Sequence, residues 1–148
     1  MKCRLIIILI SISLMMVLNS FGEDKPFKED VYEISGLLLN ILSNYTTMNF
    51  DKITNYAEGK AKRDMEKLIF EFQNPVKYQQ IKRDLSLLSS PAIKDVQIFE
   101  NNLALAIVEW KVKRTVPQGD SNKEVVVTRE INYLFKKINN QWKLISYR

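Results

Sequence analysis

One basic residue, Arg129, stands among apolar residues in a predicted strand, where its charge needs a binding partner. Residues two apart along a strand lie on the same face of a sheet. An arginine in an apolar row needs a partner, either an acidic side chain or an anionic ligand. Arg129 is therefore a candidate to bind an anion, unless it lies beyond the part of the strand that other elements cover. The residues that share its face are apolar or aromatic: Val125, Val127, Ile131, Tyr133 and Phe135.

Four aromatic residues are candidates to line a pocket near this arginine. Each combines a large apolar ring with a polar group that can face a ligand. All of them stand at the spacing of apolar stripes, so packing in the core explains them more simply than a pocket does. The predicted ligand is a small apolar or anionic molecule. The predicted ligand-binding residues are Tyr45, Tyr56, Trp110, Arg129 and Tyr133.

The composition excludes several kinds of catalytic site. Histidine is absent, and Cys3 is the only cysteine. This excludes Ser–His and Cys–His relays, an internal disulfide and the usual zinc ligands. With four glycines and neither GxGxxG nor GxxxxGK, the chain has no phosphate-binding loop motif. The sequence thus indicates no catalytic residue, no metal site and no cofactor.

Four acidic residues remain as candidates for a general base. Asp51 falls in the first turn of a predicted helix, where the helix dipole favours an acid. Asp64 and Asp84 lie among basic residues on polar helix faces, and Glu109 shares a strand face with lysines. Solvated ion pairs explain these three. A non-catalytic binding protein, for a small ligand or a protein partner, is the favoured hypothesis. The alternatives are a small isomerase, dehydratase or cyclase, and a structural dimerisation module.

Residues 1–22 predict a secretory signal peptide. A short basic start precedes the apolar run 5–18, and Ser20 and Gly22 supply the small residues at positions −3 and −1. The run is shorter than the roughly 20 residues of a membrane span. We therefore expect cleavage before Glu23, a periplasmic or extracellular location, and membrane contact only through this segment. The abundance of Ile, Lys and Asn favours a bacterial source.

The charge balance argues against a nucleic-acid partner. The whole chain has a net charge of +5, and the signal segment carries two of its basic residues, Lys2 and Arg4. Cleavage of residues 1–22 would remove these two charges and lower the net charge from +5 to +3. An excess of this size is too small to indicate nucleic-acid binding, and export argues against that partner as well.

Residues 23–148 predict a single α+β domain, in which helices come first and strands follow. Apolar residues at helical spacing predict a long helix over 27–48, a shorter helix that begins at Asn49, and two further helices over 60–73 and 76–88. Asn49 is expected to cap the second helix, and the last helix is expected to bury Tyr78, Ile81, Leu85 and Leu88.

After Pro91 the period of the apolar residues changes to two. Two Asn-Asn pairs have the chemistry of tight turns that tolerate positive φ. Residues 116–123 are predicted to form a turn-rich loop. Because the connections are short, the strands predict a four-stranded antiparallel meander on which the helices pack. The predicted strands cover 93–100, 103–115, 124–138 and 141–148.

This order resembles the nuclear transport factor 2-like superfamily, a cystatin-like α+β cone. The resemblance lies in the long first helix with its stripe from Val31 to Tyr45, the short helix at 49–53, and the ending from Tyr133 to Ser146. The helical segment 60–88 is longer than is usual there, and no short strand is evident between the second and third helices. The resemblance implies a pocket between a strongly curved sheet and the helices, and often a homodimer through the outer face of the sheet. Functions in the superfamily vary, so the fold does not choose one.

Overall fold

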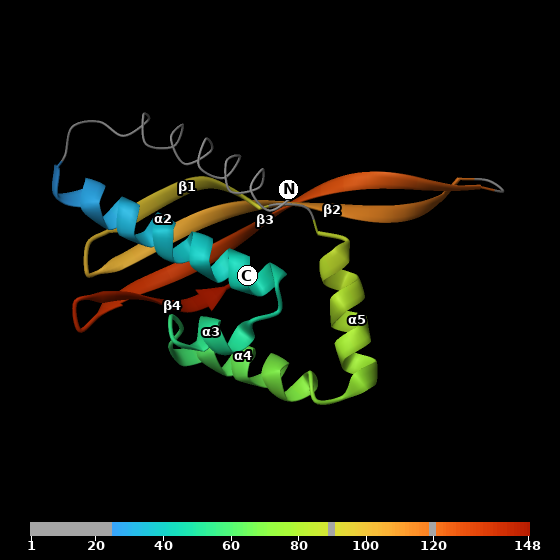
Figure 1. Cartoon of the computed structure of the whole chain (residues 1–148). Helices are drawn as coiled ribbons and strands as arrows, with labels where there is room; N and C mark the ends of the chain where they lie inside the picture. The colour runs from blue at the N-terminus through green and yellow to red at the C-terminus, as the bar shows by residue number, and fades with distance from the viewer. Residues whose placement is uncertain (1–24, 89–90, 119–120) are drawn as a thin grey trace, which may run out of the picture.

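The computed structural model describes residues 25–88, 91–118 and 121–148 (Figure 1). The predicted signal peptide and its cleavage site lie outside these residues. Within the described part, no helix is both long enough and apolar enough to span a membrane.

In the described part of the chain, four helices precede the sheet, and the first of these supplies much of the core. They are α2 (Lys25–Thr46), α3 (Phe50–Thr54), α4 (Gly59–Glu71) and α5 (Pro75–Ser86). The predicted stripe of α2 is confirmed, since one face of the helix is buried against the sheet while the opposite face is solvated. Its buried apolar residues are Val31, Ile34, Leu38, Ile41 and Leu42.

The four strands form one antiparallel meander, as predicted. They are β1 (Ala92–Phe99), β2 (Leu103–Gln118), β3 (Ser121–Ile138) and β4 (Gln141–Tyr147), in the order β1-β2-β3-β4. Both predicted Asn-Asn turns have positive φ, from 49° to 68°. The fold is therefore α+β.

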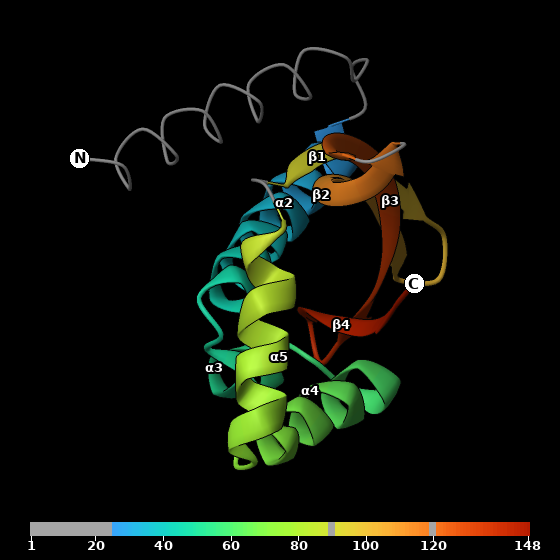
Figure 2. The same ribbon diagram turned by 90° about the vertical axis from the view of Figure 1, so that its right-hand side faces the viewer.

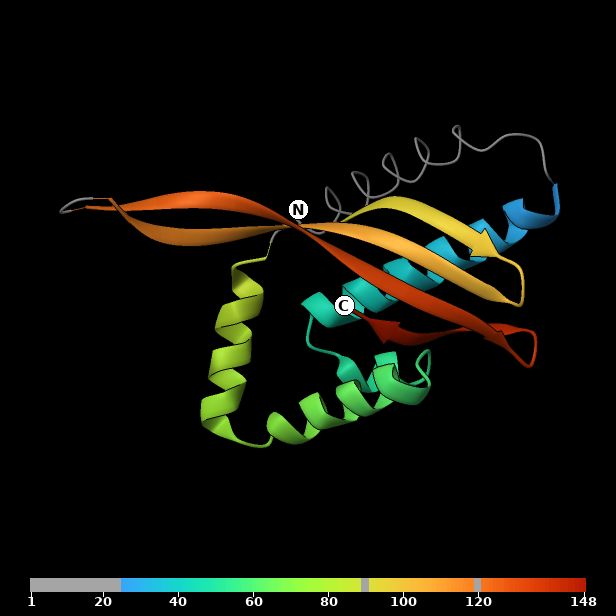
Figure 3. The same ribbon diagram turned by 180° about the vertical axis from the view of Figure 1, so that it is seen from behind.

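One prediction about the sheet is wrong, because residues 116–118 and 121–123 of the predicted loop belong to the strands β2 and β3. The pairing of β2 with β3 continues without a register shift from Leu103–Lys136 to Gln118–Ser121. The two strands therefore project beyond the helices as a long hairpin, which we call the arm: residues 111–118 of β2 and 121–128 of β3 (Figure 3).

The core lies between α2 and one face of the sheet. On β2 that face carries the fully buried Ala104, Ala106 and Val108. Trp142 on β4 is 4% exposed, and its indole N–H donates to the Asp30 carboxylate of α2 at 2.9 Å. The same oxygen accepts from Lys137 on β3 at 2.7 Å. Trp142 therefore contacts both α2 and the adjoining strand β3.

The connection from α3 to α4 contains a short strand-like piece that the sequence did not show. The amide of Leu144 donates to the Tyr56 carbonyl at 2.8 Å, and the amide of Glu58 donates to the Leu144 carbonyl at 2.8 Å. Ala57 thus makes a parallel bridge with β4. Gly59 follows with φ of +58°, a conformation that glycine adopts without strain.

Two helix predictions need correction. The side-chain oxygen of Asn49 accepts no capping bond from α3, and its side-chain N–H donates to the Thr47 hydroxyl at 3.0 Å. The side chain of Asn74 does cap α5, accepting from the amides of Val76 and Lys77. No residue of α5 is buried. Its inward-facing apolar residues are only half-buried, because α5 runs away from the sheet and meets it at one end (Figure 1).

Candidate functional site

A cavity of about 530 Å³ lies between the sheet and the helices. Figure 2 shows α2 and α5 at the left, α4 at the bottom, and the strands curving from the top down the right-hand side. That volume is within the range of small-molecule sites. The lining comes from the four described helices, the end of α5 included, and from three strands: Ile41, Tyr45, Ile53, Met65, Asp84, Leu87, Leu88, Trp110, Val112, Lys113, Arg114, Arg129, Ile131, Tyr133, Leu144 and Tyr147.

The inner end of the cavity is apolar. Ile41 of α2, Ile53 of α3 and Met65 of α4 come from the apolar stripes of their helices, and each is at most 3% exposed. Leu144 closes the floor from β4. The same periodicity that forms the core thus supplies a dry wall for a ligand.

Aromatic rings form the middle of the cavity. Tyr45 meets Trp110 edge to face, with ring centroids 6.4 Å apart. Tyr133 stacks on Tyr147 at 6.1 Å. Burial raises the pKa of Tyr45 and of Tyr147, and it raises the pKa of Tyr133 to about 12. All three hydroxyls are therefore protonated near neutral pH and can donate hydrogen bonds.

The indole N–H of Trp110 is a buried polar group of the site that lacks a hydrogen-bond partner among the described residues. Trp110 is 2% exposed, and its Nε1 makes no hydrogen bond to any described residue. The N–H lies near enough to the Tyr133 hydroxyl to oppose the rise in that group's pKa. The contact nevertheless falls short of a well-formed hydrogen bond, so the donor remains unsatisfied.

The mouth of the cavity is charged and lies where α5 ends against β2. The amide of Lys113 donates to the Leu87 carbonyl at 2.9 Å, which fixes this junction. Lys113, Arg114, Arg129 and Asp84 line the mouth. Within the described residues, none of these four side chains is in an ion pair. Three basic groups and one acidic group give the mouth a positive balance.

Arg129 lies at the boundary between the two predicted possibilities, which were a place on the covered part of the strand and a place beyond it. It pairs directly with Trp110 across β2 and β3. Trp110 is 2% exposed, whereas Val127, two residues along the face of Arg129, is 36% exposed. Arg129 is itself exposed and also lines the cavity. A guanidinium there can reach both solvent and a bound ligand.

Four of the five predicted ligand-binding residues line this cavity. Tyr45, Trp110, Arg129 and Tyr133 come together there. Tyr56 does not line it; that residue is half-buried, and its carbonyl holds the bridge to β4. Their role in binding stays a prediction, because the geometry places the residues without showing a ligand.

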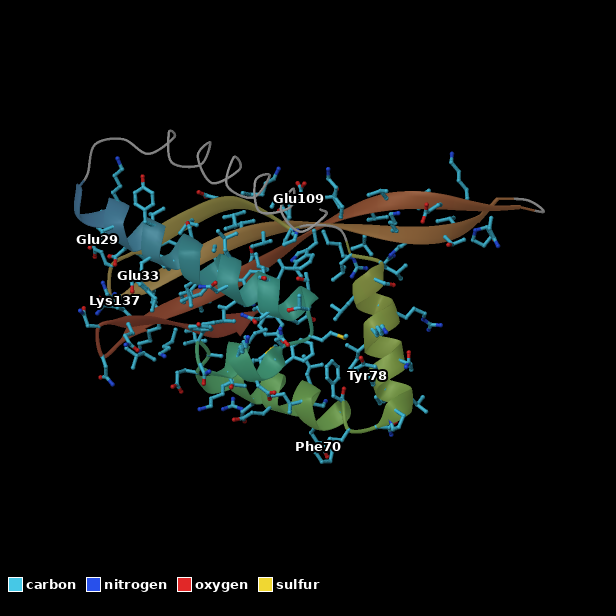
Figure 4. All side chains as sticks on the ribbon, in the orientation of Figure 1. Glu29, Glu33, Phe70, Tyr78, Glu109 and Lys137 are labelled. Carbon is cyan, nitrogen blue, oxygen red and sulfur yellow. The ribbon has the colours of Figure 1, made fainter. Side chains whose placement is uncertain are left out.

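The four candidate acids separate into one at the cavity and three elsewhere. Asp84 was expected to be a solvated ion-pair partner, and instead it lines the mouth. Asp51 is exposed on α3, and Asp64 pairs with Lys60 within α4. Glu109 is half-buried on the outer face of the sheet (Figure 4) and pairs with a lysine of β1 at 3.0 Å. No group of three or more metal-ligating side chains occurs in the part of the chain that the structure describes.

Known proteins share the fold of this chain but little of its sequence. No protein-family model matches the chain, and no curated protein sequence matches it. An NTF-2-like protein of unknown function from Shewanella oneidensis aligns with a TM-score of 0.51 at 16% identity, over 78% of this chain and 95% of the other. The chain has an NTF-2-like fold. The intermembrane space region of the chloroplast protein ARC6 aligns at 12% identity, over 74% of this chain and 90% of that one, with a TM-score of 0.41.

Proposed function

We propose that this protein binds a small, mostly apolar molecule with an anionic group in its NTF-2-like cavity, without catalysing a reaction. The observation that carries the proposal is the gradient along one cavity. Its inner end is lined by buried apolar side chains, and its mouth carries Lys113, Arg114 and Arg129 against Asp84.

The two ends favour different parts of a ligand. Burial of apolar ligand surface at the inner end supplies affinity, at about 25 cal/mol for each Å² removed from water. Basic groups at the mouth attract an anion, and the planar guanidinium of an arginine suits a carboxylate or a phosphate. A fatty acid, an isoprenoid phosphate or an aromatic acid has this form.

An enzyme of the isomerase, dehydratase or cyclase kind is the second candidate. Asp84 supports it, because it is the one acidic side chain among the described residues that lines the cavity. A proton transfer needs the base within reach of a donor that stabilises the developing charge. Asp84 is exposed at the mouth and the tyrosines lie deeper, which favours binding over catalysis.

A thermal-shift titration tests the proposal. Dodecanoate, geranyl phosphate and 2-naphthoate would each be titrated into the purified full chain and into Arg129→Met. A ligand that binds only the folded protein raises the melting temperature as its concentration rises. We expect at least one probe to do so with the natural chain, and the rise to be largely lost in Arg129→Met.

The matched control is Lys123→Met, which removes an exposed positive charge on the arm, away from the cavity lining. This variant should respond as the natural chain does. The proposal fails if no probe raises the melting temperature, or if the natural chain and Arg129→Met respond alike.

We also propose that the protein is exported, as the features of residues 1–22 indicate. The intact mass of the protein recovered from the periplasm or medium of a bacterial host should correspond to a chain that starts at Glu23. Retention of residues 1–22 in a membrane fraction would contradict cleavage.

A further inference from the structure

The indole N–H of Trp110 is a buried hydrogen-bond donor in the cavity wall, apart from the charged mouth. This unsatisfied N–H lines the cavity on a side chain that is 2% exposed. Buried donors without a partner are rare in proteins, because desolvation without a new hydrogen bond is costly. Such a group in the wall of a cavity is explained if a ligand supplies the acceptor.

A second donor stands beside the first. The Tyr133 hydroxyl also lines the cavity, on a side chain that is 7% exposed. The Trp110 N–H is the hydrogen-bonding neighbour that opposes the rise in this hydroxyl's pKa, and a hydroxyl that accepts can still donate its own proton. Since the hydroxyl is protonated near neutral pH, it can donate.

The partner of these donors should be neutral. Burial makes negative charge unfavourable at Tyr133, and the nearby Tyr45 adds to the effect. A carboxylate held there would lose its hydration away from the exposed basic groups at the mouth. A carbonyl oxygen accepts two hydrogen bonds without carrying a full charge, which suits this position better.

We propose that the ligand carries a carbonyl oxygen, separate from its anionic group, which accepts hydrogen bonds from Trp110 Nε1 and the Tyr133 hydroxyl. This inference rests on the proposed function, and it narrows the ligand to a keto acid or a related carbonyl-bearing anion. The edge-to-face rings of Tyr45 and Trp110, together with Tyr147, favour a planar conjugated skeleton.

Two rigid probes isolate the carbonyl oxygen. 9-Fluorenone-2-carboxylate and fluorene-2-carboxylate share their rings and carboxylate and differ only by C=O against CH₂. Titration calorimetry should show that the ketone binds the full chain about tenfold more tightly, as expected when a new hydrogen bond satisfies a buried donor.

Trp110→Phe keeps an aromatic ring and removes the N–H, so most of this tenfold preference should disappear. Trp142→Phe is the matched control: the same substitution is made at the other tryptophan, whose N–H already has Asp30 as its acceptor. The control should keep the preference. Tyr133→Phe gives a second reading if Trp110→Phe does not fold, and it should also reduce the preference.

The outcomes separate this inference from the proposed function. Equal affinity of the natural chain for the two probes, with both affinities dependent on Arg129, overturns the carbonyl site and leaves the anion site standing. Equal weakening of both probes by Trp110→Phe assigns the indole to the carboxylate, and this also overturns it. If neither probe binds, the planar keto-acid class is wrong, and the titrations with dodecanoate and geranyl phosphate still decide the proposed function.

Discussion

The two halves of the β2–β3 hairpin have the same backbone pairing and different surroundings. In the near half, the side chains that face the helices are Ala104, Ala106, Val108 and Trp110, all at most 2% exposed. In the arm, the same face carries Val112, which is half-buried, and Val127, which is 36% exposed. The register between the strands does not change from one half to the other.

The difference shows that strand pairing and burial have separate causes here. The neighbours β1 and β4 end at pairs involving Glu109 and Tyr133. Among the described residues, the arm then has one isolated bridge, from Val112 to Leu88, and no further strand beside it. The C-terminal end of α5 meets the base of the arm, where the Leu87 carbonyl accepts from the amide of Lys113, and the rest of the arm projects beyond the helices (Figure 3). The mouth of the cavity lies at this boundary, where a basic side chain can be wet and still reach a ligand.

Trp142→Ala tests the covered half and should have the largest effect. It removes a buried ring and a hydrogen bond to Asp30. Truncation of a large aromatic side chain in a core costs about 3–5 kcal/mol. Urea unfolding of the natural chain and the variant would measure the loss. A loss below about 1 kcal/mol, typical of surface changes, would contradict the placement of Trp142.

Asp30→Asn tests the ion cluster that joins α2 to the sheet, and its effect should depend on pH. Burial raises the pKa of Asp30, but the hydrogen bonds from Lys137 and Trp142 outweigh it, so the pKa lies below its ordinary value. The ionised group therefore stabilises the fold above the unfolded pKa of about 3.9, and this contribution is lost as the pH falls through the folded pKa.

The free energy of unfolding would be measured from pH 7 down to about pH 3. The natural chain should lose about 1 kcal/mol more than Asp30→Asn over this range, a modest value because the pair is partly solvated. Asp51→Asn, a change on the exposed first turn of α3, is the control and should follow the natural chain. Parallel profiles for the natural chain and Asp30→Asn would contradict a stabilising role for the ionised group.

Val126→Thr tests the arm and should have the smallest effect. Val126 is 60% exposed, so the added hydroxyl meets water and the unfolding free energy should change by less than about 0.5 kcal/mol. The same substitution in the covered half, Val108→Thr, buries an unpaired hydroxyl and should cost about 1–3 kcal/mol. Similar losses at the two positions would remove the distinction between the halves.

Sequence periodicity predicted the covered half better than the arm. The stripe of α2 and the Asn-Asn turns follow from local chemistry, and both are confirmed. The loop over 116–123 was predicted because the segment is rich in residues that favour turns, Pro117 and Gly119 among them. In β2, Pro117 occupies the same edge as Lys113, whose N–H points outward to Leu87. Its ring thus removes no hydrogen bond to β3, and the strand continues.

The candidate site was only partly predictable, because it depends on an irregularity in β4 and on the path of α5, which local sequence spacing does not show. Strict alternation along β4 from Trp142 and Leu144 would turn Ser146 toward the cavity. A register shift, in which Ser146 pairs with Leu134 and Leu144 with Phe135, places Tyr147 opposite Tyr133 instead. A single inserted residue in a strand has no signature in the period of the sequence. The place of Asp84 at the mouth depends on where α5 crosses, and local spacing does not fix this either.

A crystal structure of the chain grown with 9-fluorenone-2-carboxylate tests the central claim most directly. The account predicts the probe within the cavity, its rings beside Tyr45 and Trp110 and its carboxylate at the basic mouth near Arg129. A cavity closed by the side chains of Leu87 and Leu88 at saturating probe, or the probe bound elsewhere on the surface, would contradict the claim that this cavity is a ligand-binding site.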